Sequence, residues 1–152
     1  MVITFGKLRI ADLGDLQNST SERLVCPVNK LGRMDLYMTA HHGVGNDNPP
    51  ATVDALHPRV AIMNNTPTHG GEFRAPAQPV WVTLHNSPGF VDLWQLHFSE
   101  VGKKEHNAPE EFIANLTAQC EGKWIEVTAA ADGAFTVRNS RTGFQKRYPE
   151  YR

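Results

Sequence analysis

Two short segments of this 152-residue chain carry side chains that could bind a metal ion. The first is Leu-Gly-Asp-Leu at residues 13–16, which contains Asp15. The second is Ala-His-His-Gly at residues 40–43, which contains His41 and His42. A carboxylate can bridge two divalent cations because each oxygen supplies a ligand, and neutral imidazole suits zinc, iron and manganese. Because such cations lower the pKa of a shared water, these residues indicate chemistry by a metal-bound hydroxide.

The two segments supply only part of a metal site. A catalytic zinc ion usually takes three protein ligands, and no H-x-H-x-D-H cluster occurs in the sequence. His69 lies in a Thr-His-Gly-Gly-Glu segment near Glu72 and is a candidate third ligand. We expect the remaining histidines to be surface or hydrogen-bonded core residues, namely His57, His85, His97 and His106. Read without any family pattern, Asp15 could be a turn or capping residue, and the His-His-Gly segment a solvated turn.

Each of the two segments follows an apolar run that predicts a β-strand. Residues 2–5 and 7–13 alternate in hydrophobicity around Gly6-Lys7 and predict a tight hairpin. Residues 35–40 and 59–64 predict the next two strands. Two short helices are predicted between the strands: 19–31, with Ser19 and Glu22 as a capping box, and 50–57, with Pro50 at its start.

The second half of the chain is less regular. Residues 64–78 predict an irregular, turn-rich loop, and residues 79–86 are compatible with either a helix or a strand. We expect a strand at 91–98 and a helix at 108–116. The Asp132-Gly133 pair predicts a hairpin between strands at 123–129 and 134–138. We expect residues 138–152 to form a solvated terminal hairpin.

These elements predict an α/β fold with a mixed β-sheet, helices on one face and a C-terminal β-hairpin extension. Residues 1–66 would form the αβ part that carries Asp15 and His42. Residues 67–152 would complete the same domain. The two cysteines, Cys26 and Cys120, are too few for a disulfide framework, so we expect buried thiols.

The composition of the chain limits the kinds of partner that we expect it to bind. Hydrophobic residues make up 40% of the chain and charged residues 20%, as in soluble globular proteins. The net charge of −1 gives no reason to expect nucleic-acid binding. The sequence has no run of about 18 apolar residues and no signal-peptide pattern, so we expect no membrane partner. Two expectations about localisation follow: the protein is cytoplasmic, or it is processed from a longer precursor.

The order and spacing of these motifs resemble the second half of the metallo-β-lactamase-fold hydrolases, and most closely the hydrolase domain of DNA-uptake competence proteins. The resemblance is carried by ITFGKLRIADLGDL, by MDLYMTAHHG and by a segment ending in LHPRVAIMNN at Asn65. In that family a strand-end Gly-Asp-Leu supplies the metal-bridging aspartate, and a strand-end His-His-Gly supplies the last histidine ligand. The rest of the chain resembles, in less detail, the C-terminal extension of a bacterial subgroup.

The resemblance implies that Asp15 is the bridging carboxylate. It implies that His42, next to Gly43, is the histidine ligand, with His41 as an alternative ligand or a supporting residue. Zinc or another divalent metal would be the cofactor. The whole protein would be a four-layer αββα sandwich, of which this chain would form about one half. The family's H-x-H-x-D-H motif, which supplies most of the ligands, has no counterpart here.

Three hypotheses about function follow. The chain could be part of a metal-dependent hydrolase of an ester, phosphoester or amide, truncated here, whose N-terminal half lies elsewhere. It could instead be a non-catalytic half-domain that self-associates and binds metal weakly at most. It could also be a homodimer in which two copies of Asp15 and the His41-His42 pair form one site. Because a bare half-sandwich would expose a large apolar face, we expect self-association under the second and third hypotheses.

Overall fold

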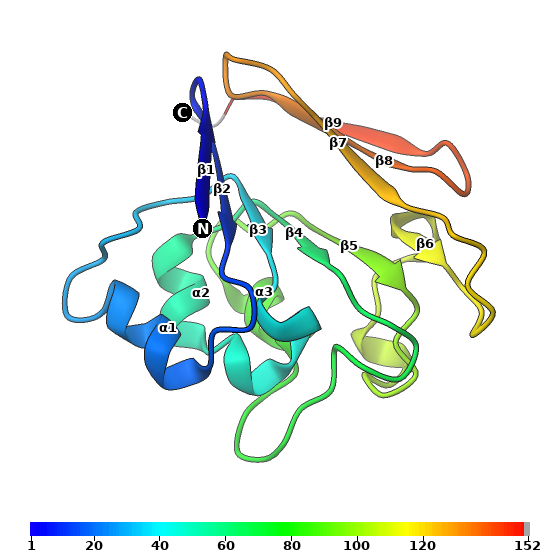
Figure 1. Cartoon of the computed structure of the whole chain (residues 1–152), viewed down its shortest axis with the longest axis horizontal. Coiled ribbons are helices and arrows are strands. Elements are labelled where there is room, and N and C mark those ends of the chain that lie inside the picture. Colours follow the sequence, from blue (N-terminus) through cyan, green and yellow to red (C-terminus); the bar gives the residue numbers. More distant parts are fainter. Residues whose placement is uncertain (151–152) are drawn as a thin grey trace.

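The computed structural model describes residues 1–150, so Tyr151 and Arg152 of the predicted terminal segment lie outside the described residues (Figure 1). Its centre is a six-stranded sheet in the order β1-β2-β3-β4-β5-β6. The strands are β1 (Val2–Phe5), β2 (Leu8–Asp12), β3 (Leu36–Met38), β4 (Val60–Met63), β5 (Asp92–His97) and β6 (Ile113–Asn115). Strand β1 is antiparallel to β2, whereas β2 to β6 run parallel to one another. The mixed sheet that the sequence predicts is therefore confirmed.

Three short helices lie on one side of this sheet (Figure 1). They are α1 (Asn18–Val25), α2 (Pro50–Leu56) and α3 (Val80–Asn86). Helix α2 begins at Pro50, whose missing N–H costs nothing at a first helical position, and ends at His57 in a left-handed conformation. The capping box expected at α1 is wrong, because the residue before the helix is Gln17 and Ser19 lies inside it. No helix within residues 1–150 has the length and apolar character that crossing a membrane requires.

The helix expected over residues 108–116 is also wrong. A single 3-10 turn occupies Glu110–Phe112, and strand β6 follows it. Strand β6 pairs with β5 through Gln95–Ile113 and His97–Asn115. Parallel pairing buries all three residues of β6, and this tertiary gain outweighs the local helical preference of the segment.

The C-terminal extension contains the predicted β-hairpin, and a further strand completes a separate antiparallel sheet of three strands. Its strands are β7 (Ile125–Ala129), β8 (Phe135–Asn139) and β9 (Gln145–Tyr148), and the turn at Asp132-Gly133 joins the first two as predicted. It lies across the sheet from the helices (Figure 1). The segment is not merely solvated, because Tyr148 is buried and accepts a hydrogen bond from Trp94 Nε1 at 3.0 Å. The Tyr148 hydroxyl donates in turn to Asp92 Oδ2 at 2.6 Å.

The small sheet reaches the turn between β1 and β2, where Lys7 N–H donates to the Ala131 carbonyl at 3.1 Å, but it does not cover all of β1. The strand register places Ile3 and Phe5 of β1 on the same face as Trp94, which contacts the small sheet. Ile3 and Phe5 nevertheless remain 42% and 51% exposed. Strand β1 is an edge strand, so these two side chains are exposed apolar groups at an edge of the main sheet.

Both cysteines are free and exposed, so the expectation of buried thiols is wrong. Cys26 directly follows α1, and Cys120 lies in the connection between β6 and β7. Neither residue lies on a core-facing position of a helix or strand, which is where a buried thiol would pack.

Candidate functional site

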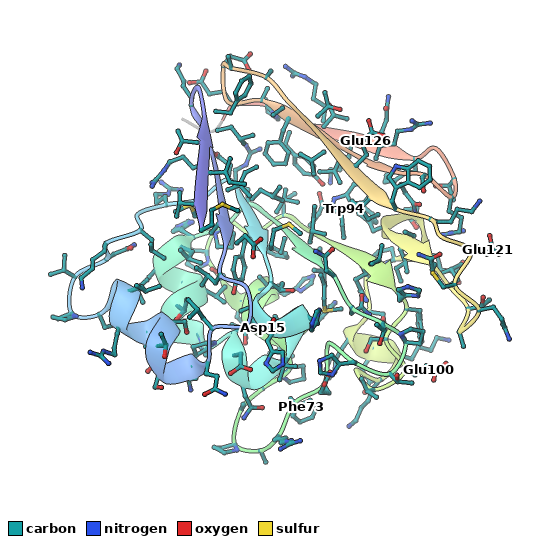
Figure 2. The ribbon with its side chains drawn as sticks, in the orientation of Figure 1. Asp15, Phe73, Trp94, Glu100, Glu121 and Glu126 are labelled. Carbon is teal, nitrogen blue, oxygen red and sulfur yellow. The ribbon has the colours of Figure 1, made fainter. Side chains whose placement is uncertain are left out.

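The predicted site residues lie at the edge of the sheet where the parallel strands end. In open α/β sheets, ligands bind outside the carboxyl ends of the strands. Asp15 follows the end of β2 (Figure 2), and His41 and His42 follow the end of β3. Strands β2 and β3 are neighbours, and the backbone N–H of His41 donates to the carbonyl of Gly14 at 2.9 Å. The structure therefore places the two segments side by side.

The His-His-Gly turn has a strained backbone. His41 has φ 47° and ψ 53°, and His42 has φ 58° and ψ 16°. Left-handed backbone costs roughly 1–2 kcal/mol for a residue other than glycine, and it persists only where the surroundings impose it. Gly43 follows with φ 87°, and a Cβ there would lie 2.3 Å from Met63 Sδ. Local preference alone would not give this turn, so other residues must hold it.

Asn48 holds the turn. Its side chain is fully buried, and its Oδ1 accepts hydrogen bonds from the Tyr37 hydroxyl at 2.7 Å and the Ala40 N–H at 3.0 Å. Its Nδ2 donates to the carbonyls of Ala40 at 2.9 Å and Val44 at 2.7 Å. Burial raises the pKa of Tyr37, which keeps its hydroxyl protonated as a donor. Four hydrogen bonds from one carboxamide thus fix the backbone on both sides of His41 and His42.

Each of three histidines has its Nδ1 atom in contact with an oxygen. The contacts are His41 with Asp47 Oδ2 at 2.6 Å, His42 with the Asn64 carbonyl at 2.9 Å, and His69 with Glu72 Oε1 at 3.0 Å. A neutral imidazole that donates Nδ1–H to such an acceptor carries no proton on Nε2. Histidines that bind metals are usually oriented in this way, with the second ring nitrogen bound to a carboxylate or a carbonyl.

The three imidazoles form one cluster although they come from two loops. Ring centroids are 6.0 Å apart for His41 and His42, 5.6 Å for His41 and His69, and 5.2 Å for His42 and His69. The loop after β4 carries His69 and is joined to the His-His-Gly turn by a hydrogen bond from Gly71 N–H to the Gly43 carbonyl at 3.0 Å. His69, a candidate from the sequence, therefore lies beside both predicted histidines.

Asp15 is not part of this cluster. Its side chain is exposed, and its carboxylate has no hydrogen-bond or ion-pair partner within residues 1–150. Within residues 1–150, no group of three or more His, Cys, Asp or Glu side chains is arranged so that it could hold a metal ion. The donors at this edge therefore have the types that a divalent transition metal prefers, but their arrangement is incomplete.

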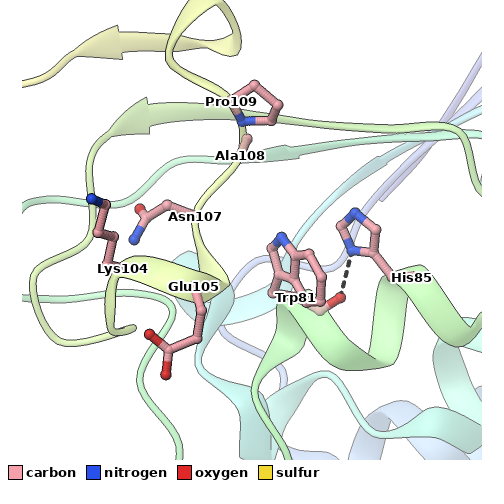
Figure 3. A pocket seen from close by; sticks show the side chains of 7 residues that line it. All are labelled: Trp81, His85, Lys104, Glu105, Asn107, Ala108 and Pro109. Atoms are coloured by element: carbon pink, nitrogen blue, oxygen red, sulfur yellow. Dashed lines mark hydrogen bonds between the residues drawn. The ribbon is translucent and has the colours of Figure 1, made fainter.

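A small cavity opens beside the cluster. It has a volume of about 280 Å³, and both carboxylate–imidazole pairs and Arg74 line it, together with Val44 and Asn46. A larger cavity of about 610 Å³ lies between α3 and the 3-10 turn at Lys104–His106 (Figure 3). Trp81 and His85 stack on one of its walls at 3.8 Å. None of the predicted site residues lines the larger cavity, whereas His41 and His69 line the smaller one.

Two of the remaining histidines, His85 and His97, differ from each other in exposure and in hydrogen bonding. His85 is exposed and its Nδ1 contacts the Trp81 carbonyl at 2.7 Å (Figure 3). His97 is buried, and its Nδ1 has no hydrogen-bond partner in the described part of the chain. Burial lowers the pKa of His97, which favours the neutral ring. These two residues show that a lone histidine in this sequence is not a reliable sign of a site.

Sequence reasoning missed Asp47 and Asn48. Both lie in the segment GVGNDNPP, whose composition predicts a solvated loop. In the structure they are buried and bind the His-His-Gly turn. No sequence pattern indicates that an asparagine in a polar loop is buried. The bonds from Asn48 to the His-His-Gly turn are therefore visible only in the folded structure.

Comparison of the chain with models of protein families, with curated proteins and with solved structures found no match in any of the three.

Proposed function

We propose that this chain supplies part of the metal centre of a hydrolase of the metallo-β-lactamase type. The proposal is carried by one observation: the backbone bond between His41 and Gly14 joins the two strand-end segments that would offer the ligands. Asp15 would be the bridging carboxylate and His42 a histidine ligand, with His41 as the alternative. The exposed carboxylate of Asp15 is available to a cation, because nothing within residues 1–150 binds it.

The bound cofactor would be zinc or another divalent metal, which supplies hydroxide at neutral pH for attack on an ester, phosphoester or amide. The chain's own residues present the donors. Asn48 fixes the histidine turn, and Asp47 and the Asn64 carbonyl orient the two imidazoles. Because the donors at this edge do not complete a site as they stand, the proposal requires further ligands, which a polypeptide segment with an H-x-H-x-D-H-like cluster would supply.

The first test is zinc affinity, measured by calorimetry on the purified chain after removal of metals with a chelator. We expect Asp15→Ala and His42→Ala each to weaken zinc binding at least about tenfold, because each removes a ligand. His85→Ala is the matched control, since it removes an exposed histidine away from this edge. Zinc binding that is equal in all four proteins would reject the proposal.

A second candidate function is a non-catalytic half-domain that self-associates. The observation in its favour is the exposed apolar pair Ile3 and Phe5 on the edge strand β1. Exposed hydrophobic edge strands tend to pair with another chain unless charges or turns protect them. Under this proposal, light scattering coupled to size exclusion gives a dimer mass, and Phe5→Lys gives a monomer. A monomer mass for the unmodified chain at high concentration would contradict it.

A further inference from the structure

We infer that His69 joins His41 and His42 in a three-histidine site for a divalent transition-metal cation. This inference rests on the proposed function, since it concerns the metal at the same edge of the sheet. It goes beyond the motif resemblance, which assigns no role to His69. It also differs from the proposed function in one respect, because the three-histidine site does not need Asp15.

The backbone already places the three side chains on one rigid surface. Gly71 N–H donates to the Gly43 carbonyl at 3.0 Å, and Gly45 N–H donates to the Glu72 carbonyl at 2.8 Å. At Gly70 the two loops are so close that a Cβ would lie 2.2 Å from the His42 carbonyl oxygen. Two hydrogen bonds and one close approach thus lock the loops together. The positions of the rings then depend on side-chain torsions alone.

The spacing of the rings is close to that of a metal site. With metal–nitrogen bonds of about 2.0–2.1 Å, two imidazole centroids around a tetrahedral ion lie roughly 5 Å apart. The observed separations of 5.2, 5.6 and 6.0 Å exceed this value by about 1 Å at most. The nitrogens do not converge as they stand. Because the outer torsion of histidine has a broad energy profile, the inference requires the rings to rotate about this torsion until the nitrogens meet on a bound cation.

The electrostatics of the site favour a cation. Asp47 and Glu72 each contact an imidazole Nδ1, which leaves the opposite nitrogen of each ring to bind a cation. Both carboxylates line the cavity of about 280 Å³, where Arg74 is the one guanidinium among the lining residues. With neutral histidines the lining carries a net negative charge. The net negative charge of the lining and the nitrogen donors therefore both favour the binding of a cation at this site.

Cobalt(II) is the probe for this site, because it substitutes for zinc and its visible absorption reports bound nitrogen ligands. We expect His69→Ala to weaken cobalt binding at least about tenfold, through loss of a ligand. Glu72→Gln should weaken it by about tenfold, because removing the group that orients a ligand typically costs 10–100-fold in affinity. His85→Ala is the control and should bind cobalt like the unmodified chain.

A second measurement needs no substitution. In proton–nitrogen correlation spectra of the unmodified chain, cobalt should broaden the imidazole signals of His41, His42 and His69 together. The His85 signal should persist at the same cobalt concentration. Far-ultraviolet circular dichroism of each variant shows whether the fold is kept, and the unmodified chain gives the answer if a variant unfolds.

The outcomes separate this inference from the proposed function. If His42→Ala loses cobalt while His69→Ala binds it normally, the inference is overturned and the proposed function stands. If His42→Ala and His69→Ala both lose cobalt and Asp15→Ala keeps it, the inference holds and Asp15 loses its proposed role. Cobalt that leaves the three imidazole signals of the unmodified chain unchanged overturns the inference.

Discussion

Replacing Asn48 with alanine tests how the strained histidine turn is held. The carboxamide makes four hydrogen bonds in a fully buried position. In Asn48→Ala the Ala40 N–H keeps the Tyr37 hydroxyl as an acceptor at 3.1 Å. The Val44 carbonyl likewise keeps the Asp47 N–H as a donor at 3.1 Å. The Ala40 carbonyl and the donor hydrogen of Tyr37 lose their Asn48 partner.

The size of the effect follows from these two groups. A buried polar group left without a partner costs about 1–3 kcal/mol, and water entering the vacated space reduces the cost. We therefore expect the free energy of unfolding to fall by roughly 2–3 kcal/mol, a large part of the about 5–15 kcal/mol of a typical domain. Without the clamp, the left-handed backbone at His41 and His42 should relax, since that conformation is costly for both residues.

Urea unfolding followed by circular dichroism measures the loss. Asn46→Ala is the matched control, because Asn46 lies in the same segment and its side-chain oxygen accepts a single hydrogen bond, from the Arg74 N–H at 3.1 Å. We expect the control to lose less than about 1 kcal/mol. The reasoning is refuted if Asn48→Ala stays within about 1 kcal/mol of the unmodified chain, or if the two variants lose the same amount.

Three further predictions concern other parts of the fold. Gly43→Ala should cost about 2 kcal/mol, seen as a lower melting temperature, because φ is 87° and the added Cβ would press on Met63; an unchanged melting temperature contradicts this. Tyr148→Phe should lower the free energy of unfolding by about 1.5–3 kcal/mol through loss of its bond to the Asp92 carboxylate, and a neutral result in urea unfolding would show that this bond does not hold the small sheet. Burial holds the pKa of His97 below 6.5, so its stabilising effect is fully present above pH 6.5 and declines as the pH falls through the folded-state pKa. His97→Gln should therefore flatten the pH dependence of stability below pH 6.5, and an unchanged slope would assign that dependence to other groups.

The arrangement of the main sheet could be predicted because it depends on local patterns. Alternating apolar residues at 2–5 and the buried run at 59–64 gave β1 and β4. Long crossover connections that contain a helix join parallel neighbours, and the carboxyl ends of parallel neighbours share one edge of the sheet. The placement of Asp15 beside the His-His-Gly turn follows from this rule, and the bond between Gly14 and His41 agrees with it.

The elements that the sequence did not predict depend on distant contacts. Strand β6 forms because β5 offers a free edge, although residues 108–116 favour a helix locally. The burial of Tyr148 depends on Trp94 and Asp92. Local propensity carries no information about such partners, so these features appear only in the folded chain.

In the site, too, some features could be predicted from residue type and others depend on contacts between distant segments. His69 could be named as a candidate ligand from its residue type, but its closeness to His42 comes from glycine contacts between two loops. The buried role of Asn48 had no sequence signal, because it lies among residues typical of a solvated loop. Residue types thus indicated the chemistry, and backbone contacts between loops decided which of them meet.

Crystals grown with zinc and measured at the zinc absorption edge test the central claim most directly. The claim is that the ends of β2 and β3 together offer a carboxylate and imidazole nitrogens to one cation or its bound water. The account predicts an anomalous peak beside the His41-His42 turn, with Asp15 or its water on the same ion. A zinc ion found only at His85 or His106, with no peak at this edge of the sheet, would contradict it.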